Sequence, residues 1–285
     1  MPKKNASKRI PTAFTEEQFN SFILPHLYIP KYGPKPKISY FKKFTYISKI
    51  LTTGSQWHEL VVDKDETGQP EIHYSNIHRT HLLWSGHGSY EEIFVNSVVT
   101  LKNNNLLDLE VIHGDGTTQS AKKGGDNLGF NGHKKIKGDK HIVFSDRNCN
   151  IVAPFLSVPG NRNECAAFES AFGKLKKSFK AFGISFHGSI MSLDGVYNSK
   201  ANRKLIHNSQ MTPNINLRKC DKERKGRNQK FDEKIFKERF HTIERAFAWE
   251  DKFKRLLLRF EIKNVHHYEM KAIAHSMINL RHFCR

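Results

Sequence analysis

Short apolar segments alternate with longer helix-like segments from residue 104 onward, and this alternation limits the fold more than any other feature of the sequence. The β-rich segments are 109–115, 141–146, 150–158 and 189–195, and the helix-like segments are 163–179 and 198–206. Such alternation is typical of an α/β or α+β domain with a central sheet, here over residues 104–285. Segment 141–155 predicts a hairpin in which Asp146 is a turn residue.

The preceding part of the chain predicts a small helical module over residues 14–103, after a basic, flexible arm over residues 1–13. Its helices begin or end at typical polar and glycine positions, namely the capping box of Thr15 with Gln18, then Gly54, Ser75 and Ser89. The module is either a plain helical cap on the next domain or a helix-turn-helix reader of DNA. In the second case, Arg79 on the polar face of the second helix is a candidate for groove contact.

The charge of the chain indicates a polyanionic partner. It has 47 Lys and Arg against 28 Asp and Glu, a formal charge of +19 that no soluble metabolic enzyme of this size needs. DNA, RNA and anionic membranes all respond to such an excess. The two strongest basic clusters, 119–141 and 218–239, lack the apolar helix face that anchors a protein to lipid, so a nucleic acid is favoured.

Other features of the composition indicate a cytoplasmic protein. The longest apolar stretches fall far below the roughly 18 residues that span a bilayer, and no apolar run follows the first charges, so we expect neither a membrane span nor a secretion signal. The four cysteines form no Cys-x-x-Cys pair. This spacing suits a reducing compartment and gives no framework for zinc.

Three acidic residues are candidates for catalysis. Asp115 and Asp194 each follow an apolar strand and precede a glycine, and Glu244 lies on a predicted C-terminal helix. Carboxylates at the ends of neighbouring strands can converge with one from a packed helix, and converging carboxylates require a cation such as Mg²⁺ or Mn²⁺. Two such ions support in-line displacement at a phosphodiester. Taken singly, the two aspartates can instead be turn residues, and Glu244 can lie on a solvated helix face.

A glycine- and lysine-rich stretch follows Asp115. Residues 115–140 contain six lysines, two acids besides Asp115 and five glycines after Gly116. Such a backbone can approach phosphates closely, which makes five lysines candidates for DNA binding: Lys122, Lys123, Lys134, Lys135 and Lys137. The stretch is not a nucleotide-binding P-loop, because the Gly-Lys-Ser/Thr ending is missing. A mobile basic surface loop is the alternative.

The C-terminal segment predicts one long helix from Asp232 to Phe260, after an exposed basic loop over 218–231 and before a last helix at about 266–281. At about 100° per residue, Lys237 and Arg255 share the face of Glu244 on such a helix. These two cations are therefore predicted to bind a phosphate beside the metals. Ordinary ion pairing on an exposed helix face needs the same spacing and is the alternative.

Several motifs together resemble the DDE-type transposases of bacterial insertion sequences, in the broad group related to insertion sequence five. They are DGTT…AKKGG…GHKKIKG, Asp194-Gly195 followed by Tyr197, IERAFAWEDKFKRLLLRFE, and the N-terminal segment YGPKPKISYFKKFTYISKILTTGSQWHEL. The resemblance implies a ribonuclease-H-like catalytic domain with a central mixed sheet. It further implies two divalent ions, binding to terminal inverted repeats and to target DNA, and strand cleavage and transfer by Asp115, Asp194 and Glu244. A homodimer or larger assembly is expected, since two element ends must meet.

The chain departs from that group in its helix signature, which is Tyr, two residues, Arg, three residues, Glu, six residues, Lys. Here Phe236 takes the place of Tyr and Arg239 follows correctly, but four residues separate Arg239 from Glu244 and seven separate Glu244 from Lys252. The signature thus indicates Arg239 and Lys252 as DNA-binding residues, whereas helical phase favours Lys237 and Arg255. A DNA-binding protein without chemistry and a nuclease of the same fold remain alternative functions.

Overall fold

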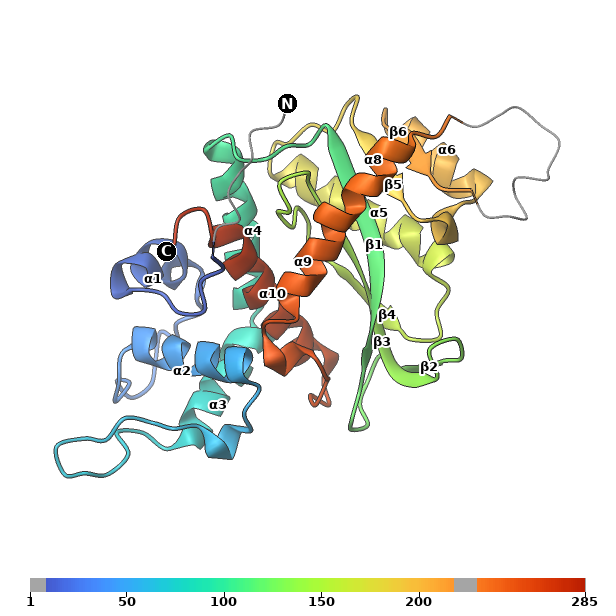
Figure 1. Cartoon of the computed structure of the whole chain (residues 1–285). Coiled ribbons are helices and arrows are strands. Elements are labelled where there is room, and N and C mark those ends of the chain that lie inside the picture. The colour runs from blue at the N-terminus through green and yellow to red at the C-terminus, as the bar shows by residue number, and fades with distance from the viewer. Residues whose placement is uncertain (1–8, 218–229, 285) are drawn as a thin grey trace. The chain divides into compact units, whose positions relative to one another are not determined.

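The computed structural model describes residues 9–217 and 230–284. They form two compact units (Figure 1). The helical unit contains the described residues up to Ser97, Lys122–Asp126 and the chain from Trp249 on, and the sheet unit contains Val98–Ala121 and Asn127–Ala248. The C-terminal segment thus groups with the N-terminal helices, unlike the expected division into 14–103 and 104–285. Most of the predicted arm and of the predicted loop at 218–231 lies outside the described residues.

The sheet unit is built on one mixed sheet. Its strands are β1 (Val111–Ser120), β2 (Gly129–Asn131), β3 (Ile136–Ser145), β4 (Leu156–Pro159), β5 (Ile190–Leu193) and β6 (Thr212–Ile215). Their order is β2-β3-β1-β5-β6, with β4 pairing β3. The central strand β1 runs antiparallel to β3 and parallel to β5, and β5 runs parallel to β6. The expected α/β fold with a central mixed sheet is confirmed.

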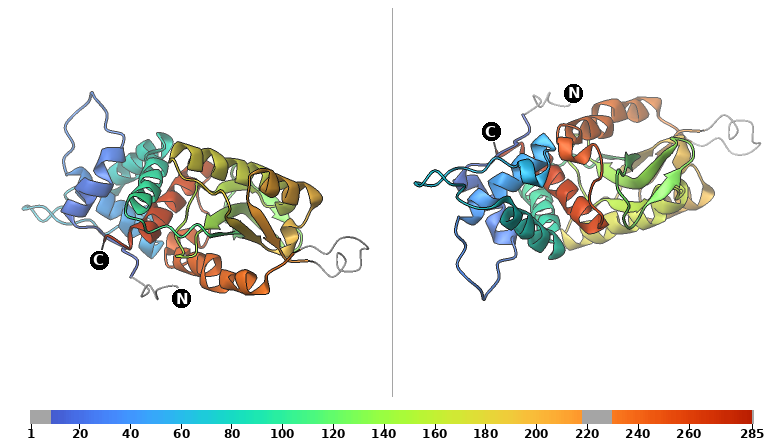
Figure 2. Two further views of the ribbon diagram at one scale, coloured as in Figure 1. Left: turned by 90° about the horizontal axis from the view of Figure 1, so that it is seen from above. Right: turned by 90° about the horizontal axis from the view of Figure 1, so that it is seen from below.

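Helices cover both faces of this sheet (Figure 2). On one face lie α5 (Glu164–Ala181) and α6 (Lys200–Asn208), which begin where Asn163 and Ser199 accept backbone N–H groups with their side chains. A stripe of α5 side chains packs against apolar side chains of β1, β3 and β5 to form the core, with Phe168, Phe172, Leu175 and Phe179 from the helix and Ile112, Phe144 and Leu193 from the strands. This stripe repeats at helical spacing, which is why the sequence predicted α5 correctly.

The hairpin predicted at 141–155 is present. Ser145 pairs with Ile151 in an isolated antiparallel bridge, and the carboxylate of Asp146 accepts hydrogen bonds from the backbone N–H groups of Asn150 (2.7 Å) and Asp108 (3.0 Å). Asp146 is therefore a turn residue, as predicted.

The glycine- and lysine-rich stretch after Asp115 is largely β structure, unlike the surface loop that was the alternative interpretation of this stretch. β1 continues to Ser120 and pairs with β3 as far as Gly138, while β2 adds a short third strand. These segments are polar and rich in glycine, so no apolar alternation revealed them. Inter-strand hydrogen bonding, a non-local interaction, holds them.

The single C-terminal helix expected from Asp232 to Phe260 was also wrong. Asp232 does cap a helix, but α8 (Glu233–Lys237) is followed by a 3₁₀ turn (Glu238–His241), then α9 (Ile243–Glu250) and a further 3₁₀ turn at Lys254–Leu256. The break falls at Thr242, whose φ of −124° and ψ of −93° are not helical. Helical phase therefore does not carry from Lys237 to Glu244 or on to Arg255.

The helical unit contains α1 (Glu16–Phe22), α2 (Tyr40–Thr53), α3 (Tyr74–Gly86), the first part of α4 (Ser89–Asn103) and α10 (Asn264–Leu280). The predicted capping box and the left-handed Gly54 at the end of α2 are both present. The last helix, α10, is almost entirely buried, and its Glu269 accepts the backbone N–H groups of Tyr90 and Glu91 at the start of α4. Among the described helices, none is long and apolar enough to cross a membrane.

Gly114 controls how closely the central strands pack, which gives a first prediction. A Cβ at Gly114 would lie 2.7 Å from a methyl of Leu193 on β5 and 2.8 Å from the ring of Phe144 on β3. Gly114→Ala should therefore lower the free energy of unfolding by about 1–3 kcal/mol, measured by urea denaturation. The matched control is Gly132→Ala, whose Cβ would meet nothing within 4 Å and which should be near neutral. Equal stability of the two variants would contradict this packing argument.

Candidate active site

The register of β1 and β5 brings Asp115 and Asp194 together. Gly114 pairs with Leu193 between these parallel strands, so the next residue on each, Asp115 and Asp194, is at the same level of the sheet. Asp194 directly follows β5, as predicted. Asp115 was expected at the end of its strand but lies inside β1, opposite Val143 of β3, because β1 continues beyond it.

Each aspartate is held by the glycine after it. The backbone N–H of Gly116 donates to Oδ1 of Asp115 at 2.8 Å, and that of Gly195 donates to Oδ1 of Asp194 at 2.7 Å. Such short contacts to the following amide fix the orientation of a carboxylate. The two Asp-Gly pairs therefore present their carboxylates in similar, restrained conformations.

Arg239 is the cation that all three candidate carboxylates share. Its Nη2 lies 2.5 Å from Oδ2 of Asp115, and the guanidinium also lies 3.7 Å from Asp194 and 3.5 Å from Oε1 of Glu244 in the first turn of α9. The ring of Phe236 lies 5.2 Å from the guanidinium carbon. The structure thus brings together Asp115, Asp194, Glu244 and Arg239, all within the sheet unit.

The other predicted cations are placed differently. Lys237 is exposed and pairs with Glu233, and Arg255 belongs to the helical unit, where it pairs with Glu261 at 2.6 Å. Lys134, Lys135 and Lys137 are exposed on the β2–β3 turn and β3. The remaining four are exposed residues of the helical unit, namely Arg79, Lys122, Lys123 and Lys252. Of the four C-terminal cations considered, only Arg239 contacts the carboxylates.

Sequence reasoning missed the residues that hold Arg239 in place. Its neighbour Glu238 receives two hydrogen bonds from Arg147, at 2.7 and 2.8 Å, and lies 3.7 Å from the buried His113 of β1. Arg147 itself follows the hairpin turn residue Asp146. Glu238 therefore ties the 3₁₀ turn carrying Arg239 to the sheet, a long-range contact that no local motif signals.

The electrostatics of the site favour a further cation. Three carboxylates share one guanidinium, which leaves a formal charge of −2 when all are ionised. Burial raises the pKa of Asp115 to about 6, with Arg239 opposing the shift and the charges of Glu244 and Asp194 adding to it. A buried carboxylate beside two others is costly to ionise, and a bound cation lowers that cost.

The donor set fits a divalent metal in its chemistry. Carboxylate oxygens are the hard ligands that Mg²⁺ and Mn²⁺ prefer. As they are placed, no group of three His, Cys, Asp or Glu among the described residues is arranged to hold a metal ion. Instead the guanidinium of Arg239 neutralises the carboxylates, so binding of a cation requires at least one of these ion pairs to rearrange.

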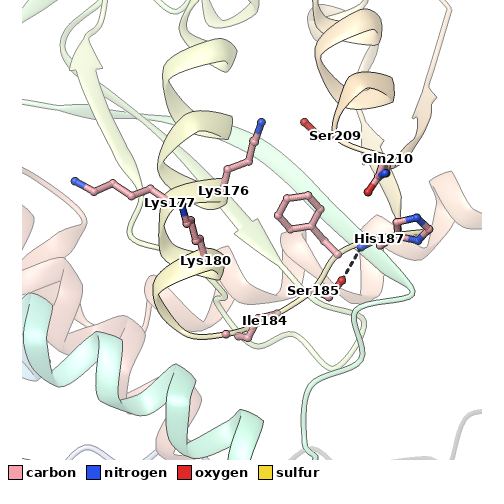
Figure 3. A pocket seen from close by; sticks show the side chains of 10 residues that line it. Lys176, Lys177, Lys180, Ile184, Ser185, His187, Ser209 and Gln210 are labelled. Atoms are coloured by element: carbon pink, nitrogen blue, oxygen red, sulfur yellow. Dashed lines mark hydrogen bonds between the residues drawn. The ribbon is translucent and has the colours of Figure 1, made fainter.

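A separate basic pocket of about 700 Å³ lies elsewhere in the sheet unit. Figure 3 shows Lys176, Lys177 and Lys180 on one helix, α5, across from Ser209, Gln210 and His187. Since His187 precedes β5, this pocket is at the opposite end of that strand from Asp194. It is therefore distinct from the carboxylate site, and its lysines suit an anion.

The raised pKa of Asp115 gives a second prediction. The folded protein holds this proton more tightly than the unfolded chain, so stability falls as pH rises from about 4 to about 6. Asp115→Asn stays neutral and should exceed the wild type in free energy of unfolding by about 3 kcal/mol at pH 7.5 without divalent ions. The difference should vanish near pH 4 in urea denaturation. A variant that is less stable than the wild type at pH 7.5 would refute the assigned cost of ionisation.

Among solved structures, the chain resembles complexes of the Mos1 transposase. The Mos1 transposase paired-end complex with left transposon end aligns over 82% of this chain and 83% of its own, at 10% sequence identity and a TM-score of 0.28. A pre-cleavage Mos1 transpososome aligns over 92% and 83%, at 10% identity and a TM-score of 0.27. The Mos1 mariner paired end complex with Mn aligns over 87% and 80%, with the same identity and score.

No family model matches the chain, and no curated protein matches it in sequence. The structural similarities are too distant to assign a family.

Proposed function

We propose that this protein is a DDE-type transposase of a bacterial insertion sequence, in the group related to insertion sequence five. It would bind the terminal inverted repeats of its element and catalyse metal-dependent DNA cleavage and strand transfer. The observation that carries the proposal is the convergence of Asp115, Asp194 and Glu244 around Arg239 on one face of a ribonuclease-H-like sheet.

The three carboxylates would hold two Mg²⁺ or Mn²⁺ ions. When bound, such ions activate a water or hydroxyl and stabilise the leaving oxygen of an in-line displacement. A water would attack a phosphodiester at the element end and displace a 3′-hydroxyl. That hydroxyl would then attack a phosphodiester of the target DNA and displace a 3′-hydroxyl of the target strand. The two Asp-Gly pairs orient the carboxylates for this task, through the amides of Gly116 and Gly195.

Arg239 is suited to bind the phosphate that reacts. A guanidinium offers five N–H donors in a planar fork that matches two phosphate oxygens, and in the structure only one of its nitrogens is within hydrogen-bond distance of Asp115. Phe236 packs against its face. Arg239 can therefore exchange a carboxylate for a phosphate oxygen with a small rotation of its side chain.

The exposed lysines would bind the DNA backbone. Three of them, Lys134, Lys135 and Lys137, lie on β3 and on the turn between β2 and β3 in the sheet unit. The helical unit exposes the other four, Lys122, Lys123, Lys252 and Arg79. Contacts of this kind position a duplex without reading its sequence. We further propose that the protein acts in the bacterial cytoplasm as a homodimer or larger assembly, because two element ends must be joined to one target.

The catalytic assignment gives a third prediction. Asp115→Asn, Asp194→Asn and Glu244→Gln should each lower Mg²⁺-dependent cleavage of DNA carrying the inverted repeats that flank the gene, by about 1,000-fold or more. Cleavage and strand joining are measured on labelled DNA in gels. Glu169→Gln, on the exposed surface of α5, is the matched control and should cleave like the wild type.

Three other outcomes would contradict the proposal. Cleavage that survives all three substitutions would show that these carboxylates are not the catalytic group. Cleavage without any joined product would indicate a nuclease of this fold. Salt-sensitive binding without metal-dependent cleavage would indicate a DNA-binding protein without chemistry.

The competition between Arg239 and metal gives a fourth prediction. Arg239→Gln removes the shared counter-charge, so its Tm in EDTA at pH 7.5 should fall below that of the wild type. Mg²⁺ or Mn²⁺ should then raise the Tm of the variant by more than that of the wild type, because the ion no longer displaces a guanidinium. Tenfold tighter metal binding corresponds to about 1.4 kcal/mol. The exposed Arg162 supplies the control, Arg162→Gln; metal shifts equal to the wild type in both variants would rule out the competition.

A further inference from the structure

A continuous exposed segment lies between the 3₁₀ turn at Leu24–His26 and α2 in the helical unit. All residues from 28 to 37, with the sequence YIPKYGPKPK, are exposed, and the side chain of Tyr32 near its middle is 92% exposed. The segment carries Lys31, Lys35 and Lys37, and the chain has no Asp or Glu between Glu17 and Glu59. We call residues 29–37 the tyrosine loop.

The tyrosine loop is fixed at its N-terminal end. The ring of Tyr28 stacks on His87, with centroids 3.6 Å apart and planes at 9°. The backbone N–H of Tyr28 donates to Oγ of Ser89 at 2.9 Å, and its C=O accepts the indole N–H of Trp84 at 3.1 Å. These contacts attach the start of the loop to α3 and α4.

Its C-terminal end is fixed as well. Ile38 is 9% exposed, and Ser39 caps α2 by accepting the backbone N–H of Lys42 at 3.2 Å. The tyrosine loop is therefore anchored to the helical unit at both of its ends.

Within the loop, prolines and one glycine shape the backbone. Pro30, Pro34 and Pro36 fix φ near −65° and remove N–H donors, which favours an extended chain that does not pair with itself. Gly33 has a φ of +123°, which side-chain-bearing residues rarely adopt. This turn follows Tyr32 directly and places it at the bend.

The side chains of the loop are available to a partner. No hydrogen bond, ion pair or ring contact involves the side chains of Tyr32 or of the three lysines within the described residues. A tyrosine ring left in water contributes nothing to folding, and three unpaired lysines on one short loop repel each other. The loop therefore carries both an apolar ring and a charge excess that only an external anion would use.

The geometry points to the minor groove of duplex DNA as the binding site of the tyrosine loop. We propose that the loop lies in the minor groove, with Tyr32 against the base pairs and the lysines paired to the flanking phosphates. A bent loop that presents one side chain at its tip can enter a groove about 6 Å wide, whereas a helix about 10 Å across does not fit there. Wedging of an apolar side chain and pairing of cations with the groove walls are established ways to bind there.

Other partners fit the loop less well. The prolines at 30, 34 and 36 give no Pro-x-x-Pro spacing, which domains that bind proline-rich peptides require. Proteins that bind single strands stack successive bases on several aromatic rings, whereas this loop presents Tyr32 alone at its bend. The inference rests on the proposed function only in taking DNA as the partner.

The test uses the full chain and fluorescence anisotropy with labelled duplexes, A·T-rich or G·C-rich, and with a matching single strand. Tyr32→Ala should weaken binding to the A·T-rich duplex about tenfold, and Tyr32→Phe should bind like the wild type. Lys35→Gln/Lys37→Gln should lower the slope of log K against log salt by about 1.8, from about 0.9 for each phosphate contact. Netropsin, which occupies the minor groove, should compete with the wild type, and methyl green, which occupies the major groove, should not.

The exposed lysines Lys49 and Lys64 provide the charge-matched control. Lys49→Gln/Lys64→Gln should change the salt slope less than the loop variant does. All substituted positions are exposed, so the variants should fold.

Each other result overturns the inference. It fails if Tyr32→Ala binds duplex DNA like the wild type, if netropsin does not compete, or if the loss appears only on the single strand. No binding of duplex by the wild type would remove both the inference and the proposed partner. Binding that depends on Tyr32 in a protein that never cleaves DNA would support the inference while the catalytic proposal fails.

Discussion

Three carboxylates that share one guanidinium are the interaction on which the rest of the sheet unit depends. Asp115 and Asp194 are fixed on adjacent parallel strands, so they cannot separate to relieve their repulsion. Arg239 offsets that repulsion, and Glu238 and Arg147 hold the turn that delivers it. One guanidinium against three carboxylates still leaves a site that gains from a further cation, which is the electrostatic state expected of a metal-dependent phosphoryl-transfer centre.

One face of β1 packs in the core of the sheet unit, and the other face carries the candidate site. A Cβ at Gly114 would touch Leu193 and Phe144, and one at Gly116 would touch Glu164 of α5, so these positions face α5. Because side chains alternate along a strand, Asp115 between them faces away from α5, where Arg239 meets it. Gly114 and Gly116 thus permit close packing on the core face of β1, while Asp115 lies on its opposite face.

The sequence was sufficient where burial is local and periodic. It predicted β1, β3, β5, α5 and α6 from alternation or helical spacing, and the capping box at Thr15 from its residue types. It missed the short core strand β6. It failed for β2 and the first half of β3, whose polar residues are held by pairing of β2 with β3 and of β3 with β1. It also failed for the helix expected to run through Thr242. There apolar residues recur at helical spacing on both sides of Thr242, so the sequence pattern continues across a break in the backbone. Extrapolating helical phase over that break selected Lys237 and Arg255, while the signature of the resembling group had already pointed to Arg239.

Only part of the net charge of +19 is available to a partner, because some of the cations are buried in ion pairs. In the helical unit, Arg255, Arg259 and Lys271 are buried and paired with Glu261, Asp126 and Glu250, so they stabilise the fold and offer little to a partner. Among the described residues, the cations that stay available to a partner are exposed ones, on β3 and the turn between β2 and β3, on α5, on the tyrosine loop and at Arg79, Lys122, Lys123 and Lys252. Only this exposed fraction can release counterions from a nucleic acid, and it therefore determines the strength and the salt dependence of binding. The positions of the exposed cations, rather than the total excess of charge, therefore determine how this protein binds an anionic partner.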